Sequence, residues 1–315
     1  MPVIDTEYIN NTKMAHTLRI RRVRASPREV RLNIKSIPRK NVSISATLRL
    51  KDKVSLDTEI TPYDMAIMDA VCTLYVVGGD YFTAEMIARV LAGNFGNKTL
   101  SPECLRDIKN SMDKLAVIRV KLDVTDEYKI RHKVSKDNNK RITFESYLLP
   151  IEKTTVVAGN GKELNGYHLI EAPVLYRYAH DVGQVLCIPL QMLSIGNVAR
   201  NTQCNILIKR YLAERISLML NENNMIQSRM IRYEGYDSNG TRTGLYQNIG
   251  VYREDFGSPE AWRNKRADIH HTVCSVLNCY IEKGIITEYT IIKEQRQIVG
   301  VKVTLPIDVK QLPRE

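Results

Sequence analysis

The sequence lacks the paired cysteines of a structural zinc site. Its cysteines are scattered and none forms a CxxC pair: Cys72, Cys104, Cys187, Cys204, Cys274 and Cys279. Such spacing favours a reducing compartment. The chain also has no run of about 18 apolar residues, the length of a membrane span, and its first residues, MPVIDTEYIN, do not resemble a signal peptide. We therefore expect a cytoplasmic protein with no membrane partner.

Signals for catalysis and cofactor binding are also missing. The stretch GNFGNKT at 93–99 hints at a phosphate-binding loop, but Asn97 rather than glycine precedes Lys98. Adjacent His270 and His271 would point about 100° apart on a helix, so they do not share a metal. No His-hydrophobic-His triplet with a downstream tyrosine is present, as a rolling-circle nickase would need. We expect no enzymatic activity, no cofactor and no metal.

Acidic residues are nearly absent between residues 13 and 53. This segment holds 13 lysines and arginines against Glu29 and Asp52, a net charge of +11, which equals the formal net charge of the whole 315-residue chain. Basic segments attract phosphate polyanions or acidic membrane surfaces, although a solvated arm without a partner is the alternative. The candidate DNA contacts in this segment are Arg19, Arg21, Arg22 and Arg24.

The basic segment nevertheless contains strand patterns. Apolar and polar residues alternate strictly from Val42 to Leu50, and Val30, Leu32 and Ile34 alternate in the same way. Alternation of this kind is typical of half-buried strands. We expect residues 1–54 to form a basic, strand-containing N-terminal arm.

Helical patterns follow the arm. Thr61-Pro62 and Ser101-Pro102 each resemble a capped helix start, and Thr83 can cap a helix between them. Strand patterns then occupy 117–124 and 141–148. Three helices and a β-hairpin are typical of a winged helix, an elaborated helix-turn-helix. We predict a first winged-helix domain at 55–165. The middle of the chain, roughly 150–190, has the pattern of glycine-broken strands with a short helix after Pro173.

The second half repeats this plan. A helical pattern covers about 203–222, a glycine-rich insertion lies near 233–250, and another helix starts at Ser258 and ends near Gly284. From Ile269 onward, we expect Val273, Val276, Leu277 and Tyr280 to form its buried stripe. Two strand patterns, 285–293 and 297–305, form a terminal hairpin. We predict a second winged-helix domain at 166–315, and an α+β fold with two winged-helix domains in tandem.

The front of the last helix is the main candidate for reading DNA. The N-terminal part of a recognition helix enters the major groove, where arginine and lysine suit guanine and asparagine suits adenine. The alternative is an exposed basic helix start with no partner. The candidate contacts are Arg263, Asn264, Lys265, Arg266, His270, His271 and Thr272.

The matching helix of the first domain offers Arg106 and Lys109, but acidic neighbours balance them, so we expect weaker reading or self-association there. Both wings carry cations that would position the protein on phosphates, with plain solvated loops as the alternative. These cations are Lys129, Arg131, His132, Lys133 and Lys136 in the first wing, and Lys293 and Arg296 in the second.

Three stretches resemble a known family: TPYDMAIMDAVCTLY, IKNSMDKLAVIRVKLDV and NTQCNILIKRYLAERISLML, the last followed by a basic helix and a hairpin. They are similar to the iteron-binding plasmid replication initiators, which have two winged-helix domains. The resemblance implies binding to repeated origin DNA, recruitment of host replication proteins and a monomer–dimer balance. Its chief reader would be the helix with Lys265, Arg266 and His270. The basic arm and the insertion near 233–250 depart from the family plan.

Two other functions stay open at this point. A tandem winged-helix transcriptional regulator would also bind double-stranded DNA, and a nuclease or nickase is the less favoured alternative. Replication of an origin plasmid separates an initiator from a regulator, and metal-dependent cleavage of supercoiled DNA would identify an enzyme.

Overall fold

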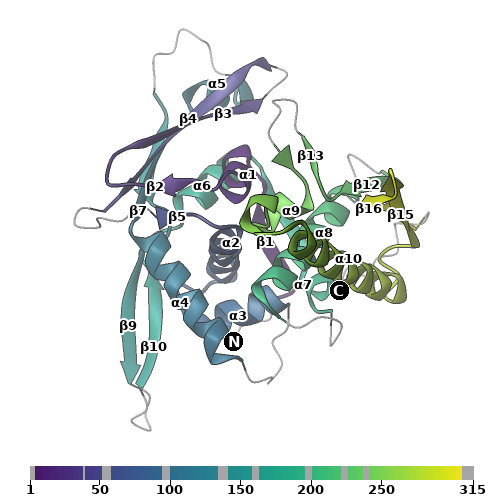
Figure 1. Cartoon of the computed structure of the whole chain (residues 1–315). Coiled ribbons are helices and arrows are strands. Elements are labelled where there is room, and N and C mark those ends of the chain that lie inside the picture. The colour runs from purple at the N-terminus through teal and green to yellow at the C-terminus, as the bar shows by residue number, and fades with distance from the viewer. Residues whose placement is uncertain are drawn as a thin grey trace. The chain divides into compact units, whose positions relative to one another are not determined.

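The computed structural model describes residues 4–37, 40–51, 58–93, 100–133, 141–157, 163–195, 201–220, 226–236 and 242–306. Helices and strands are interspersed along the chain, which confirms the predicted α+β class. The chain forms two compact units (Figure 1). Unit 1 comprises 1–91 and 95–187, and unit 2 comprises 92–94 and 188–315.

A four-stranded antiparallel sheet in unit 1 joins the N-terminal segment to the middle of the unit. Its order is β3–β4–β7–β8, with β3 (Val30–Ile37), β4 (Val42–Leu50), β7 (Ile118–Asp123) and β8 (Thr143–Tyr147). The alternation predicted for Val42–Leu50 is confirmed, since every second side chain of β4 is buried. Because β4 pairs with β7 along its length, the basic segment is part of unit 1 rather than the separate arm expected at 1–54.

Helix α2 (Pro62–Val76) forms the core of unit 1. Thr61 caps it in a reciprocal box: the Thr61 hydroxyl accepts from the Asp64 amide at 3.2 Å, and the Asp64 carboxylate accepts from the Thr61 amide at 2.7 Å. The helix is apolar on nearly all sides, which suits burial on all sides. It contacts β1 (Thr6–Asn10), α1 (Lys13–Ile20) and α4 (Pro102–Ala116).

A second sheet of unit 1 differs from the predicted wing. Strands β7 and β8 do pair with each other, but helix α5 (Thr125–Arg131) lies between them and both belong to the larger sheet. The hairpin of the second sheet comes later in the chain than the predicted wing and consists of β9 (Ile151–Val157) and β10 (Glu163–Leu169). With β6 (Tyr81–Phe82) these strands form the order β6–β10–β9.

The other elements of unit 1 are short or lie at its edges. They are α3 (Ala84–Ala92), β2 (Arg24–Ala25) paired with β5 (Thr58–Glu59), α6 (Val174–Asp181), and β11 (Val185–Pro189) paired with β1. Helix α6 confirms the short helix expected after Pro173. Since β10 pairs with β9 and α6 contacts β8, residues 166–187 belong to unit 1, not to the second domain predicted to begin at 166.

Unit 2 contains the predicted terminal helix and hairpin. Its elements are α7 (Leu190–Leu193), α8 (Gln203–Met219), β12 (Ser228–Arg232), β13 (Gly235–Tyr236), β14 (Arg242–Thr243), α9 (Leu245–Asn248), η3 (Arg253–Asp255), α10 (Pro259–Glu282), β15 (Glu288–Glu294) and β16 (Gln297–Thr304). The predicted insertion holds the β13–β14 pair and α9, and its residues 237–241 lie outside the described ranges. The sheet order is β12–β16–β15. Gly300 lets β16 approach β12, because a Cβ there would meet the Ile231 carbonyl.

The two units share one order of elements. Each runs helix, strand, helix, helix, strand, strand: α2, β6, α3, α4, β9, β10 in unit 1, and α8, β12, α9, α10, β15, β16 in unit 2. In each three-stranded sheet the last strand is central and pairs antiparallel with both others. Unit 1 adds β7, α5 and β8 between α4 and β9, and unit 2 adds β13 and β14 before α9 and η3 before α10. Helices α4 and α10 therefore hold equivalent places in the two units.

Candidate nucleic-acid interface

One face of α10 packs into unit 2 and thereby fixes the direction of the others. Ser258 caps the helix by accepting from the Ala261 amide at 3.1 Å, and Pro259 occupies the first turn. The Tyr280 hydroxyl donates to the Met192 carbonyl at 2.9 Å. The predicted buried stripe is confirmed and begins earlier than expected, with Trp262: Trp262, Ile269, Val273, Val276, Leu277 and Tyr280.

The opposite face of α10 is polar and open to solvent. Asn264, Ala267 and His271 follow one another at helical spacing and are exposed. The Asn264 amide has no hydrogen-bond partner among the described residues. Arg263 is also exposed and pairs with Glu260 at 3.3 Å, both side chains about three-quarters exposed, so this pair holds it weakly. The face thus presents an amide, an imidazole and a guanidinium to a partner, together with the exposed carboxylate of Asp268 one turn after Asn264.

Arg266 does not lie on this open face. Its guanidinium donates to the Gln297 side chain and to the Ile298 carbonyl, each at 3.3 Å, and lies 6.0 Å from the centre of the Trp262 ring. The side chain is half-buried and ties α10 to β16. Arg266, predicted as an exposed base reader, is therefore a structural contact of unit 2.

Replacing Arg266 by alanine should lower the free energy of unfolding by about 1–2 kcal/mol, because hydrogen bonds from a charged donor and a cation–π contact are lost. Arg263→Ala is the matched control on the same helix and should change stability by less than about 0.5 kcal/mol. Urea denaturation of both variants measures this difference. Equal and small losses would show that Arg266 is not an anchor.

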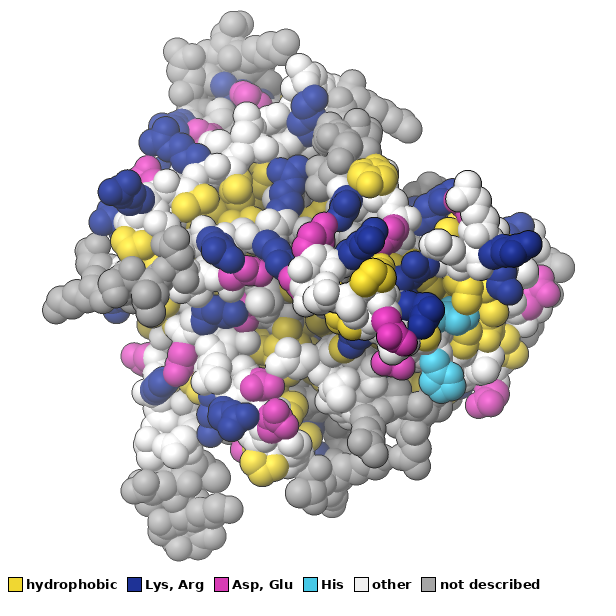
Figure 2. Space-filling model, in the orientation of Figure 1, with side chains coloured by type: hydrophobic (Ala, Val, Ile, Leu, Met, Phe, Trp, Pro, Cys, Tyr) yellow, Lys and Arg dark blue, Asp and Glu magenta, His cyan; other side chains and the backbone are white. Residues whose placement is uncertain are grey.

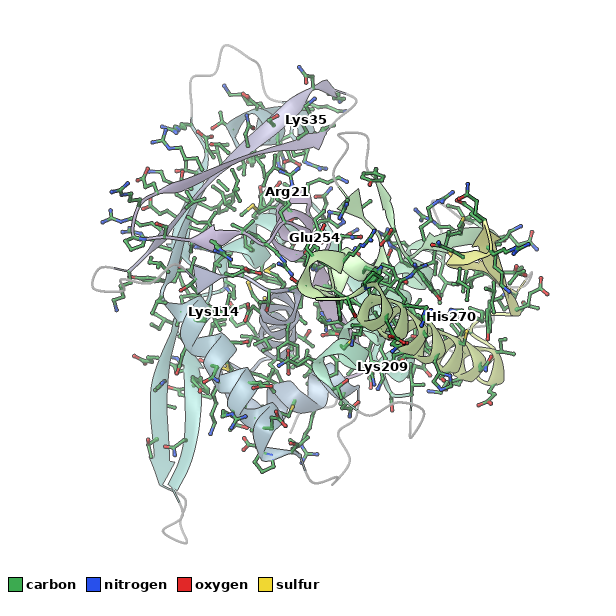
Figure 3. All side chains as sticks on the ribbon, viewed as in Figure 1. Arg21, Lys35, Lys114, Lys209, Glu254 and His270 are labelled. Atoms are coloured by element: carbon green, nitrogen blue, oxygen red, sulfur yellow. The ribbon has the colours of Figure 1, made fainter. Side chains whose placement is uncertain are left out.

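His270, labelled in Figure 3, lies on the same side of α10 as Arg266, because residues four apart share one face of a helix. Its Nδ1 is 2.7 Å from the Tyr233 hydroxyl, and its Nε2 is 3.5 Å from the Cys274 sulfur. Burial lowers the pKa of His270, and the positive charges of His271 and Lys293 lower it further. A neutral imidazole hydrogen-bonded to tyrosine serves packing rather than phosphate binding.

The other flank of α10 faces α8. The Lys265 ammonium lies beside Cys204 and opposes the rise that burial causes in the pKa of that thiol. The Thr272 hydroxyl donates to the Asn205 side chain at 3.4 Å. The open face therefore brings together three of the predicted contacts, Arg263, Asn264 and His271, while Lys265, Arg266, His270 and Thr272 lie on half-buried flanks.

The open face of α4 is charged but balanced. Arg106 lies 3.9 Å from Glu103, and Asp113 pairs with Lys153 of β9 at 2.9 Å. Lys109 is exposed and has no ion pair among the described residues. Asn110 is likewise exposed, with no hydrogen-bond partner among the described residues, so α4 also presents free polar groups.

The predicted wing cations fall in two different settings. Lys293 and Arg296 are exposed on the β15–β16 hairpin, whose turn residues Gln295 and Arg296 have φ of 47° and 66°, the left-handed backbone of tight hairpin turns. Lys129, Arg131, His132 and Lys133 lie instead on and just after α5, not on a hairpin tip. Lys136 lies outside the described residues.

The DNA contacts predicted in the N-terminal segment differ in burial. The side chain of Arg19 is only 9% exposed and pairs with Asp69 at 3.2 Å, so it is a core residue rather than a DNA contact. Arg21, Arg22 and Arg24 are exposed. Arg22 and Arg24 both lie near Glu59, at 3.9 and 3.4 Å.

The pairing of β4 with β7 creates a basic surface that the sequence did not predict. Arg49 lies directly opposite Arg119, and like charges at such paired positions repel each other. Glu145 is shared between Arg119 at 3.0 Å and Lys121 at 3.3 Å. The exposed cations of this sheet face are Arg31, Lys35, Arg49, Lys51, Arg119 and Lys121. Figure 2 shows blue side chains recurring over β3 and β4, with few magenta ones among them.

Within the described ranges, no three or more His, Cys, Asp or Glu side chains are placed to share a metal ion. Every helix in these ranges is too short or too polar to cross a bilayer.

Comparison with known proteins finds a likeness to solved structures. No protein-family model and no curated protein matches the sequence. A crystal structure of RctB domains 2–3 is similar with 14% identity and a TM-score of 0.48, over 94% of this chain and 97% of that one. A structure of selenomethionine derivatives of domains 2 and 3 of RctB is similar with 14% identity and a TM-score of 0.46, over 93% of this chain and 96% of that one. Both scores lie below 0.5, so the likeness by itself assigns neither a fold family nor a function.

Proposed function

We propose that both units are winged helices and that the chain binds double-stranded DNA sequence-specifically. The observation that carries this proposal is the element order common to the two units, with an equivalent sheet order and an equivalent third helix. In a winged helix this third helix enters the major groove. The open polar face of α10 supports the assignment, because amide, guanidinium and imidazole groups can bond base edges.

The two helices would contribute unequally. On α10, Asn264 and Arg263 lie in the N-terminal half, the part that reaches base edges, and Lys293 and Arg296 on the nearby hairpin would contact phosphates. On α4, Arg106 and Lys109 would add weaker contacts, because Glu103 and Asp113 carry opposing charge on the same helix.

We infer further that the bound sites are repeated origin sequences and that the chain initiates replication of a plasmid or mobile element in the cytoplasm. The resemblance to iteron-binding initiators supports this narrower function. It would involve host replication proteins and a homodimer as further partners. It assigns the chain a binding role rather than an enzymatic one.

The test is replication of a plasmid that carries the selected binding sites and no initiator of its own. An initiator should maintain this plasmid in cells that express the chain, and Asn264→Ala should lower its copy number. Site-specific binding without replication would reject the initiator and favour the tandem winged-helix regulator. Cleavage of supercoiled DNA that depends on added metal would instead identify a nuclease or nickase.

A further inference from the structure

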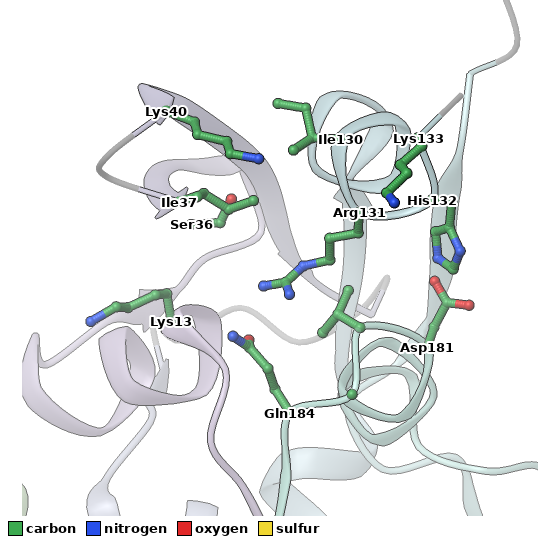
Figure 4. A pocket seen from close by; sticks show the side chains of 12 residues that line it. Lys13, Ser36, Ile37, Lys40, Ile130, Arg131, His132, Lys133, Asp181 and Gln184 are labelled. Atoms are coloured by element: carbon green, nitrogen blue, oxygen red, sulfur yellow. The ribbon is translucent and has the colours of Figure 1, made fainter. Parts of the chain in front are cut away.

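Unit 1 contains an open pocket of about 1000 Å³. Figure 4 shows it between α1, the end of β3, the end of α5 and the turn after α6. Its charged and imidazole lining residues carry an excess of positive charge: Lys13, Lys40, Arg131, His132, Lys133 and Asp181. A concave site with such an excess favours an anionic ligand.

Arg131 is held in place from behind the pocket. Its Nε donates to Glu127 at 2.7 Å, and the second oxygen of Glu127 accepts from the Tyr178 hydroxyl, also at 2.7 Å. Glu127 is fully buried, and burial together with this carboxylate raises the pKa of Tyr178, so its hydroxyl stays a donor. The two terminal nitrogens of Arg131 have no hydrogen-bond partner within the described ranges and turn toward the pocket (Figure 4).

The other polar groups of the pocket are also free. Lys13, Lys40 and Lys133 are exposed and make no hydrogen bond or ion pair with any described residue. Lys40 and the amide of Gln184 point toward the same space as Arg131 (Figure 4). A preorganised guanidinium fork beside ammonium and amide donors is the donor set that a phosphate group binds.

One hydroxyl in the wall of the pocket is left without a partner. Ser36 lines the pocket, is only 7% exposed, and its oxygen, which is closed to solvent, has no hydrogen-bond partner among the described residues. A buried polar group without a partner costs about 1–3 kcal/mol, so native structures rarely leave one unexplained. Ile37, Ile130 and Val182 form apolar parts of the lining, and pockets with apolar walls and a few convergent polar groups are typical ligand sites.

We propose that this pocket binds a phosphate group, presented either by a mononucleotide or by the backbone of a nucleic acid. Arg131 supplies a bidentate contact, Lys40 and Gln184 supply further donors, and Lys13 and Lys133 add charge at the rim. The site lies on different elements from α4 and α10. The proposal therefore stands independently of DNA reading by those helices.

The test is calorimetric titration of the full chain with inorganic triphosphate at constant ionic strength. The wild-type chain should bind it, and the double variant Lys13→Gln/Lys40→Gln should bind about tenfold more weakly, because two charge-assisted contacts are lost. The control, Arg28→Gln/Lys302→Gln, removes two exposed cations that do not line the pocket and should stay within about twofold of wild type. Thermal midpoints of both double variants verify that they are folded.

Three results would overturn the proposal. The first is absence of triphosphate binding by the wild-type chain. The second is an equal affinity of the wild type and Lys13→Gln/Lys40→Gln. The third is an equal loss of affinity in the control variant, which would mean non-specific attraction to surface charge.

Two further arms distinguish the sources of the phosphate. If a mononucleotide is the ligand, a nucleoside triphosphate should bind more tightly than triphosphate because its base packs on Ile37 and Ile130, and duplex binding should be unchanged in the double variant. If nucleic acid is the ligand, duplex DNA should displace triphosphate. In the double variant, the slope of the logarithm of duplex affinity against the logarithm of salt concentration should then become shallower by roughly 0.9 for each lost contact.

Discussion

Replacing Arg19 by alanine should destabilise unit 1 by about 3–5 kcal/mol, the usual cost of breaking a buried ion pair by removing one partner. Asp69 would keep its charge in the core with only 2% of its side chain exposed. Arg19 also donates to the Asn10 carbonyl at 2.8 Å, and that contact would be lost as well. Chemical denaturation with two-state fitting measures the loss.

Two comparisons separate the ion pair from a general effect of charge. Arg28→Ala removes an exposed arginine from the same segment and should change stability by less than about 0.5 kcal/mol. The double variant Arg19→Met/Asp69→Asn removes both charges and should recover part of the loss. A loss below about 1 kcal/mol for Arg19→Ala would show that the side chain is not an element of the core and would return it to the candidate DNA contacts.

Replacing Asn264 by alanine should weaken binding to the cognate duplex by about 1–3 kcal/mol, roughly 5- to 150-fold in Kd, if its amide makes a bidentate contact to adenine. Binding to random duplex should change little, because this contact carries sequence information and phosphate contacts do not. Stability should also change little, since Asn264 is exposed and its amide has no partner among the described residues. Titration of both duplexes against wild type and variant measures the difference.

The matched control lies on the same helix. Asn278→Ala makes the same chemical change about four turns nearer the C-terminus, beyond the part of a recognition helix that reaches base edges. Its amide accepts from the Tyr289 hydroxyl at 3.0 Å, so it has a structural partner already. We expect cognate binding within about twofold of wild type. Equal losses on cognate and random DNA for Asn264→Ala would make Asn264 a positioning contact, and no loss would exclude α10 as the reader.

The side chains of α10 show which of its contacts could be predicted from the sequence and which could not. The periodicity of Ile269, Val273 and Leu277 predicted the buried side, and the structure confirms it. It could not predict that Arg266 reaches the Ile298 carbonyl of β16, because that contact depends on how the hairpin returns to the helix. A long cationic side chain can pack its stem and bond with its tip, so charge alone does not place it in solvent.

The sheet of unit 1 shows the same limit on a larger scale. Local alternation predicted the strand Val42–Leu50, but not its pairing with β7, whose residues lie about 70 positions further along the chain. The pairing decides that Arg49 lies opposite Arg119 and that the basic segment is part of a sheet. Similarly, residues 117–124 had the pattern of a wing strand, yet the strand that pairs with β6 is β10, which also pairs with β9.

Selection of bound sequences from a random pool of duplex DNA tests the central claim most directly. The account predicts one enriched sequence for the wild-type chain, in direct repeats of about 20 base pairs if two domains read successive turns of the groove. It also predicts that Asn264→Ala relaxes the preference at an adenine within that sequence. A pool that shows no enrichment after binding by the folded wild-type chain, at moderate salt, would contradict sequence-specific recognition.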